Sequence, residues 1–205
     1  MIHGIRLMFV GVLMVTATRG EAEAPTVPKS KAGANMVGTE LPLEELRWLN
    51  TENEVAPDIT GRVTLVRWWT DTCPYCATSL PAITALEEAY SSQGFQTAAV
   101  YHPKPPRAVK NDAVLANAKR FDYESAIAVD DDWAVLQRAY LDTGSRKATS
   151  VSFLLDGEGK IRYVHPGPEL RPGKGRREAN LQTQYDDMRK AIEALLAELP
   201  KTIEE

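Results

Sequence analysis

An α/β fold with a central mixed sheet flanked by helices is predicted from three features of the sequence. The β-branched and aromatic run at 63–69 is typical of a strand buried on both faces. Apolar residues then recur at three- and four-residue steps over 74–90, which predicts an amphipathic helix that ends near Gly94. A second strand at 95–101 completes a βαβ unit, and such a crossover makes its two strands parallel.

The second half of the chain is predicted to add an αβ insertion, a β-hairpin and a terminal helix. The insertion consists of a helix at 112–121, a short strand at 126–132 and a helix at 133–140. Two β-rich runs separated by "DGEGK" within 151–167 are typical of a hairpin. The last helix is expected over 180–199.

Composition indicates one globular domain with a tail. The chain has 205 residues, of which 43% are hydrophobic and 25% charged, enough for a single core of ordinary size. The formal net charge is -4, and no long basic run is present. Binding to nucleic acid is therefore not expected.

The N-terminus predicts an exported protein. Residues 1–22 contain an apolar stretch at 7–17 that is shorter than the ~20 residues a span requires, so they resemble a signal peptide or, if uncleaved, a membrane anchor. Residues 23–38 are poor in large apolar side chains and are expected to form a flexible linker. The folded domain is assigned to 39–200 and a C-terminal tail to 201–205. The expected location is periplasmic or extracellular, with membrane contact only through an anchor.

Cys73 and Cys76 are the only cysteines, and they form a C-x-x-C motif where the first strand meets the first helix. Pro74 suits the first helical turn, which places Cys73 at the N-cap. The free N–H groups and the positive end of the helix dipole favour a thiolate there. We therefore predict that Cys73 is the attacking sulfur, that Cys76 resolves mixed disulfides, and that the pair forms a disulfide in an oxidising compartment.

With this motif at the start of its first helix, the chain resembles the thioredoxin-like superfamily over 41–199. It is most similar to the exported thiol–disulfide oxidoreductases of the TlpA/ResA type, including the DipZ-like branch. The matching stretches are "GRVTLVRWWTDTCPYC", Pro81 with "ITALEEAY", "VDDDWAVLQRAY", "VYHP" and "FLLDGEGKIRYVHPG". The resemblance implies an enzyme that acts on protein disulfides and dithiols, with an unidentified redox partner and no organic cofactor.

The chain departs from that family at three positions. Thr72 stands where a tryptophan usually precedes the first cysteine, and Arg67 stands where a buried acid or amide is usual. Ser150, preceded by Thr149, takes the place of the family's cis-proline. Because side chains alternate along a strand, Arg67 should lie beneath the cysteine pair, on the face it shares with Trp69. The expected site-lining residues are Arg67, Trp69, Thr72, Pro74, Tyr75, His102, Thr149 and Ser150.

Three other readings of the cysteine pair stay open at this point. The pair could form an inert structural disulfide. It could belong to a copper-binding protein or metallochaperone, with Cys73, Cys76 and either His102 or His165 as ligands, because soft thiolates suit Cu(I). It could also belong to a thiol peroxidase, since Thr70 precedes Cys73 by three positions. In the favoured oxidoreductase interpretation, no residue is a metal ligand. His165 is expected at the surface of the hairpin.

Overall fold

The computed structural model describes residues 25–30, 32–146, 148–165 and 167–200. The expected signal sequence at 1–22 and the tail at 201–205 lie outside this part of the chain. Among the helices that are described, none is both long and apolar enough to cross a membrane.

Six strands form one mixed sheet in the order β1-β4-β3-β2-β5-β6. The strands are β1 Arg47–Trp48, β2 Val63–Trp69, β3 Phe95–Tyr101, β4 Ala126–Val129, β5 Ser152–Leu155 and β6 Ile161–Val164. The central strands β2, β3 and β4 are parallel, whereas β1 pairs antiparallel with β4, and β5 pairs antiparallel with both β2 and β6. The predicted α/β class with a mixed sheet is confirmed.

The helices are α1 Pro74–Tyr90, α2 Asn111–Arg120, α3 Ala134–Ala139 and α4 Ala179–Glu198. Each matches a predicted helix to within a few residues, because the apolar periodicity that marks it is local. Gly94 follows α1 with a φ of 96°, a conformation that glycine adopts without strain, and the chain turns there into β3. The two-residue edge strand β1 was not predicted, because it is too short to show alternation.

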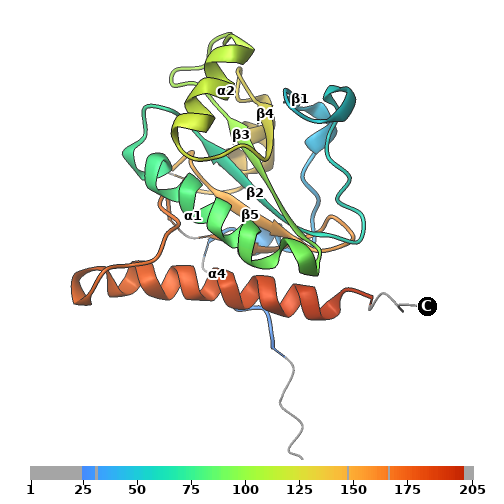
Figure 1. The fold of residues 1–205 in the computed structure, drawn as a ribbon, viewed down its shortest axis with the longest axis vertical. Coiled ribbons are helices and arrows are strands. Elements are labelled where there is room, and N and C mark those ends of the chain that lie inside the picture. Colours follow the sequence, from blue (N-terminus) through green and yellow to red (C-terminus); the bar gives the residue numbers. More distant parts are fainter. Residues whose placement is uncertain (1–24, 31, 147, 166, 201–205) are drawn as a thin grey trace, which may run out of the picture.

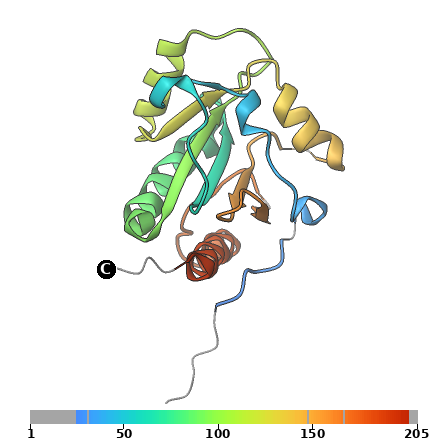
Figure 2. The ribbon, with the colours of Figure 1, turned by 90° about the vertical axis from the view of Figure 1, so that its right-hand side faces the viewer.

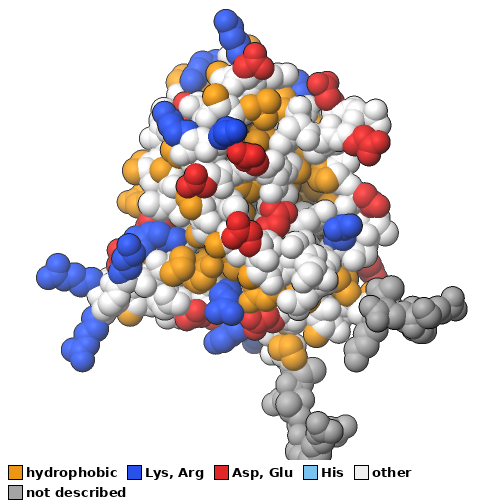
Figure 3. Space-filling view, viewed as in Figure 1, with side chains coloured by type: hydrophobic (Ala, Val, Ile, Leu, Met, Phe, Trp, Pro, Cys, Tyr) orange, Lys and Arg blue, Asp and Glu red, His pale blue; other side chains and the backbone are white. Residues whose placement is uncertain are grey.

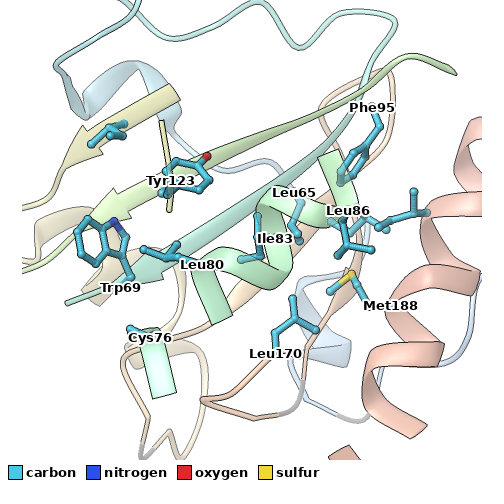
Figure 4. Packing of buried hydrophobic residues seen from close by; sticks show 14 of the residues in the cluster. Leu65, Trp69, Cys76, Leu80, Ile83, Leu86, Phe95, Tyr123, Leu170 and Met188 are labelled. Carbon is cyan, nitrogen blue, oxygen red and sulfur yellow. The ribbon is translucent and has the colours of Figure 1, made fainter. Parts of the chain in front are cut away.

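The sheet separates two hydrophobic layers (Figures 1 and 2). Helices α1, α2 and α4 cover one face and bury Leu65 and Trp69 of β2, part of the cluster drawn in Figure 4. Helix α3 and the segment before β1 cover the other face and bury Val66 and Trp68. All seven residues of β2 are buried, as expected of a central parallel strand covered on both faces.

Part of the segment that was expected to be a linker, 23–38, packs against the edge strand β6. The Ser30 hydroxyl donates to the carbonyl of Val164 (2.9 Å) and accepts its N–H (3.0 Å). Met36 is buried among the apolar residues on the face of the sheet that α3 covers. The packed part of the chain thus extends back beyond residue 39.

Charges of both signs are dispersed over the face shown in Figure 3. Lysine and arginine side chains extend from the edge where the β6–α4 connection lies, which includes the exposed Lys174, Arg176 and Arg177. Arg171 in the same connection is held instead by Glu169 (2.8 Å) and Glu178 (2.9 Å).

Candidate active site

Cys73 and Cys76 are free thiols at the N-terminus of α1. Cys73 is the N-cap residue with extended backbone angles (φ −97°, ψ 116°), and Pro74 opens the helix. The Cys73 carbonyl accepts the N–H groups of Cys76 (3.0 Å) and Ala77 (3.4 Å), which starts the helical hydrogen-bond pattern. Cys73 is partly exposed, whereas Cys76 is fully buried, so a partner protein can reach only the first sulfur.

The Ser150 side chain lies close to both sulfurs. Its hydroxyl oxygen is 3.3 Å from Cys76 Sγ and 4.0 Å from Cys73 Sγ. The Thr149–Ser150 peptide bond is trans, since Lys104–Pro105 is the one cis bond among the described residues. At the position of the family's cis-proline, this chain therefore presents a hydroxyl group to both sulfurs.

The two thiols differ in acidity because their surroundings differ. Burial opposes ionisation of Cys73, but hydrogen bonds from the Cys76 thiol, from the backbone N–H groups of Cys76 and Tyr75 and from the Ser150 hydroxyl outweigh it and lower its pKa. Deeper burial raises the pKa of Cys76, and the charge of Arg67 and the Ser150 hydroxyl offset only part of that rise. Cys73 is thus the more acidic thiol, as a nucleophile requires.

Arg67 is completely buried on the same face of β2 as Trp69. Its guanidinium donates to the Ser152 hydroxyl on β5 (3.0 Å) and to the carbonyl of Pro168 in the segment after β6. It does not pair with Asp71, whose carboxylate accepts the Tyr101 hydroxyl instead (2.9 Å). Its charge acts first on Cys76 and less on Cys73.

Three of the other predicted residues surround the cysteine pair on its apolar and exposed sides. Trp69 is buried in the same cluster as Cys76 and packs edge-on against Tyr101, with ring centroids 5.0 Å apart (Figure 4). Thr72 and Tyr75 are exposed on either side of Cys73, with 47% of Tyr75 accessible. The buried side of the site is therefore apolar, and its outer rim is exposed to solvent.

His102 and Thr149 form a hydrogen-bonded pair near the carboxyl end of β3. His102 Nε2 lies 2.9 Å from the Thr149 hydroxyl oxygen, and the ring packs edge-on against Trp133. Burial lowers the pKa of His102 to about 3, and the charges of Lys104 and Arg67 act in the same direction. A neutral imidazole is therefore the stable form at physiological pH.

His165 corrects a prediction, because it is buried and not at the surface. Its Nδ1 lies 2.9 Å from the Gly167 carbonyl oxygen, and 1% of the side chain is exposed. Burial lowers the pKa of His165 to about 4, with a further contribution from the charge of Arg67. The carbonyl of Gly167, near the start of the β6–α4 connection, thus lies against this ring.

That connection also packs on the cysteine helix, a contact that the sequence did not predict. The N–H of Leu170 donates to the buried Ser79 hydroxyl on α1 (2.9 Å), and Thr78 donates to Glu169 (2.9 Å). A pocket of about 250 Å³ lies beside it, lined by Tyr75, Gly167, Pro168, Glu169, Asn180, Leu181 and Gln184. The polar Ser79 on an otherwise apolar helix face was the one sequence signal for this contact.

The structure also bears on the peroxidase and copper-binding interpretations of the cysteine pair. The Thr70 hydroxyl is engaged by Asp71 (3.4 Å) and lies 3.5 Å from the Thr72 hydroxyl. No hydrogen bond joins it to Cys73 among the described residues. In the same part of the chain, no three His, Cys, Asp or Glu side chains come together as a candidate metal site.

Comparison with known proteins identifies the class of protein to which this chain belongs. The fold is that of the thioredoxin-like thiol–disulfide oxidoreductases, which confirms the resemblance stated from the sequence. The model of the Redoxin family matches residues 36–184, and the chain belongs to that family.

Individual relatives are distant. The chain is 24% identical to thiol-disulfide oxidoreductase YkuV of Bacillus subtilis over 123 residues, which cover 60% of this chain and 79% of that protein. It is 30% identical over 97 residues to NHL repeat-containing protein 2 of Bos taurus, a match that spans 46% of this chain but 13% of that protein. A solved structure of a proposed thiol:disulfide interchange protein DsbE from Chlorobium tepidum shares the fold, with a TM-score of 0.54, 23% identity and coverage of 76% of this chain and 97% of that one.

Proposed function

We propose that this protein exchanges disulfides with other proteins through its C-x-x-C pair. The observation that carries the proposal is the asymmetry of the two thiols. Cys73 is accessible and has a lowered pKa, whereas Cys76 is buried one turn later and has a raised pKa. This arrangement suits one sulfur that attacks and a second that waits for the mixed disulfide.

The reaction proceeds in two exchanges. The Cys73 thiolate attacks one sulfur of a substrate disulfide, a new S–S bond forms, and the other substrate sulfur leaves as a thiolate that takes up a proton. Cys76 then loses its proton and attacks Cys73 Sγ, which breaks the mixed disulfide and releases the second substrate sulfur as a thiol. The protein is left with a Cys73–Cys76 disulfide, and the substrate has gained two electrons and two protons. A redox partner of the same chemistry restores the dithiol, or drives the cycle in reverse.

Substrate polypeptides are proposed to dock beside the exposed Tyr75. The adjacent pocket, which Tyr75 and the partly exposed Pro168 both line, offers apolar contacts two residues from Cys73.

The competing peroxidase function is tested directly by comparing two oxidants. We expect the reduced protein to reduce insulin or a glutathione-type disulfide rapidly and to consume hydrogen peroxide slowly, because the Thr70 hydroxyl is engaged away from Cys73. The measurement is stopped-flow loss of tryptophan fluorescence with each oxidant. Saturable peroxide turnover at micromolar substrate would instead support a thiol peroxidase.

We also propose that the protein acts outside the cytoplasm, on the basis of the apolar segment at 7–17. Expression of the full chain in a bacterium, followed by fractionation and N-terminal sequencing, tests this. The expected product is found outside the cytoplasm, either cleaved near Ala22 or retained on the membrane by an intact N-terminus. Recovery of the intact chain in the cytosol would contradict export.

A further inference from the structure

Arg67 is a buried cation without a carboxylate partner. It is completely buried, and no acidic side chain of the described residues lies within ion-pair distance of its guanidinium. Its contacts are the neutral oxygens of Ser152 and Pro168, and its Nε has no hydrogen-bond partner. A buried charge that lacks an ionic partner is destabilising, so its retention at this position calls for an explanation.

Two acids that directly follow strands of the sheet, Asp71 after β2 and Asp130 after β4, are committed elsewhere. Asp71 accepts hydrogen bonds from Tyr101 (2.9 Å) and Asn117 (3.2 Å). Asp130 accepts from Trp68 (3.2 Å) and the N–H of Leu136 (2.8 Å) on the opposite face of the sheet. Neither carboxylate is placed to accept a proton from Cys76 or to neutralise Arg67.

We infer that Arg67 is the counter-ion of the Cys76 thiolate, and that the resolving step of the exchange depends on its charge. Arg67 and Cys76 lie on the same face of the sheet, and Cys76 is the buried group that becomes an anion during the cycle. In place of a carboxylate that accepts the proton, this chain holds a cation that stabilises the anion. The inference rests on the proposed disulfide exchange.

The resolving step conserves both protons and electrons. When Cys76 loses its proton, Arg67 stabilises the thiolate, which attacks Cys73 Sγ and breaks the bond between Cys73 and the partner sulfur. The partner leaves as a thiolate and takes up, through solvent, the proton that Cys76 released. Arg67 stays protonated throughout, so it is a positioning and charge-stabilising residue and not an acid or base.

Other titratable groups around Arg67 do not replace it. His102 from β3 and His165 from β6 are held neutral, since burial lowers the pKa of His102 to about 3 and that of His165 to about 4. Glu169, in the β6–α4 connection, is bound to Arg171 (2.8 Å). Of these described groups, the two thiols are the ones that change charge during the exchange.

The test separates the two exchanges with a chromogenic aromatic disulfide such as dithiobis-nitrobenzoate. The first released thiolate reports attack by Cys73, and the second reports resolution by Cys76. Arg67→Met is expected to slow the second release at neutral pH about tenfold for each unit by which the Cys76 pKa rises, and to shift its pH profile upward. The first release should change far less.

Two matched variants separate charge from structure. Arg67→Lys keeps the charge and should retain most of the second rate, while Ser152→Ala removes a hydrogen-bond partner of the guanidinium without changing its charge and should leave both phases near wild type. If Arg67→Met does not fold, Arg67→Gln against Arg67→Lys makes the same comparison, with circular dichroism as the check on folding.

The outcomes distinguish the inference from the function on which it rests. Equal slowing of both phases in Arg67→Met, or no change in the second phase, would overturn the role of Arg67 while leaving disulfide exchange intact. If the wild-type protein releases no second thiolate through Cys76, the proposed exchange itself fails. Loss of the second phase in Arg67→Lys to the level of Arg67→Met would show that the shape of the guanidinium matters, not its charge, and would also refute the counter-ion.

Discussion

Replacing Cys73 with serine is expected to reduce disulfide exchange by at least about 100-fold, because the remaining thiol is both buried and less acidic. Each pKa unit between two thiols costs about tenfold in thiolate at a given pH. Cys76 has a raised pKa and is completely buried, so it cannot reach a substrate disulfide. Insulin reduction by the purified variant measures this loss.

The matching variant, Cys76→Ser, should still attack but should not resolve. Mixed disulfides with partner proteins are then expected to accumulate, and they can be counted on non-reducing gels after trapping in extracts. Cys73→Ser should trap few partners under the same conditions. Equal trapping by the two variants would contradict the assignment of Cys73 as nucleophile and Cys76 as resolving thiol.

Acid is expected to destabilise the folded protein through its two buried histidines. The pKa of His165 falls from the ordinary value of 6.5 to about 4, and that of His102 falls to about 3. The unfolded chain therefore binds more protons than the folded chain between these values, so the free energy of unfolding decreases as the pH falls below 6.5. For His165 alone, the loss by pH 4 is on the order of 3 kcal/mol.

Urea unfolding at a series of pH values, followed by fluorescence, measures this dependence. His165→Gln keeps an amide near the Gly167 carbonyl but cannot take up a proton, so its stability should fall less between pH 6.5 and pH 4 than that of the wild type. The difference between the two curves isolates the histidine from the carboxyl groups. Parallel curves would show that His165 does not titrate in the folded state as expected.

Local sequence patterns predicted the βαβ unit around the cysteines with little error. The strand at 63–69 and the strand at 95–101 coincide with β2 and β3, and the helix over 74–90 coincides with α1. Each element is defined by side chains within a few positions of one another, either β-branched and aromatic runs or a three- and four-residue apolar period. The position of Cys73 at the helix start follows from the same short stretch.

The surroundings of the two sulfurs depend on contacts between distant parts of the chain. Ser150 approaches Cys76 across 74 residues of sequence, and Arg67 meets Ser152 and Pro168 across 85 and 101 residues. His165 is likewise buried, although the sequence around it is rich in Pro, Gly and charge. None of these contacts has a local period or spacing that could predict it.

The sequence by itself determined the C-x-x-C spacing, its place at a strand-to-helix junction and the α/β class, because propensity and periodicity act over one turn or one strand. Only the tertiary structure decided which thiol Arg67 acts upon, and that a serine hydroxyl touches both sulfurs. The physical reason is that electrostatic and hydrogen-bond interactions depend on distance in space and on exclusion of water. Both are set when β2, β5 and the segment after β6 pack together.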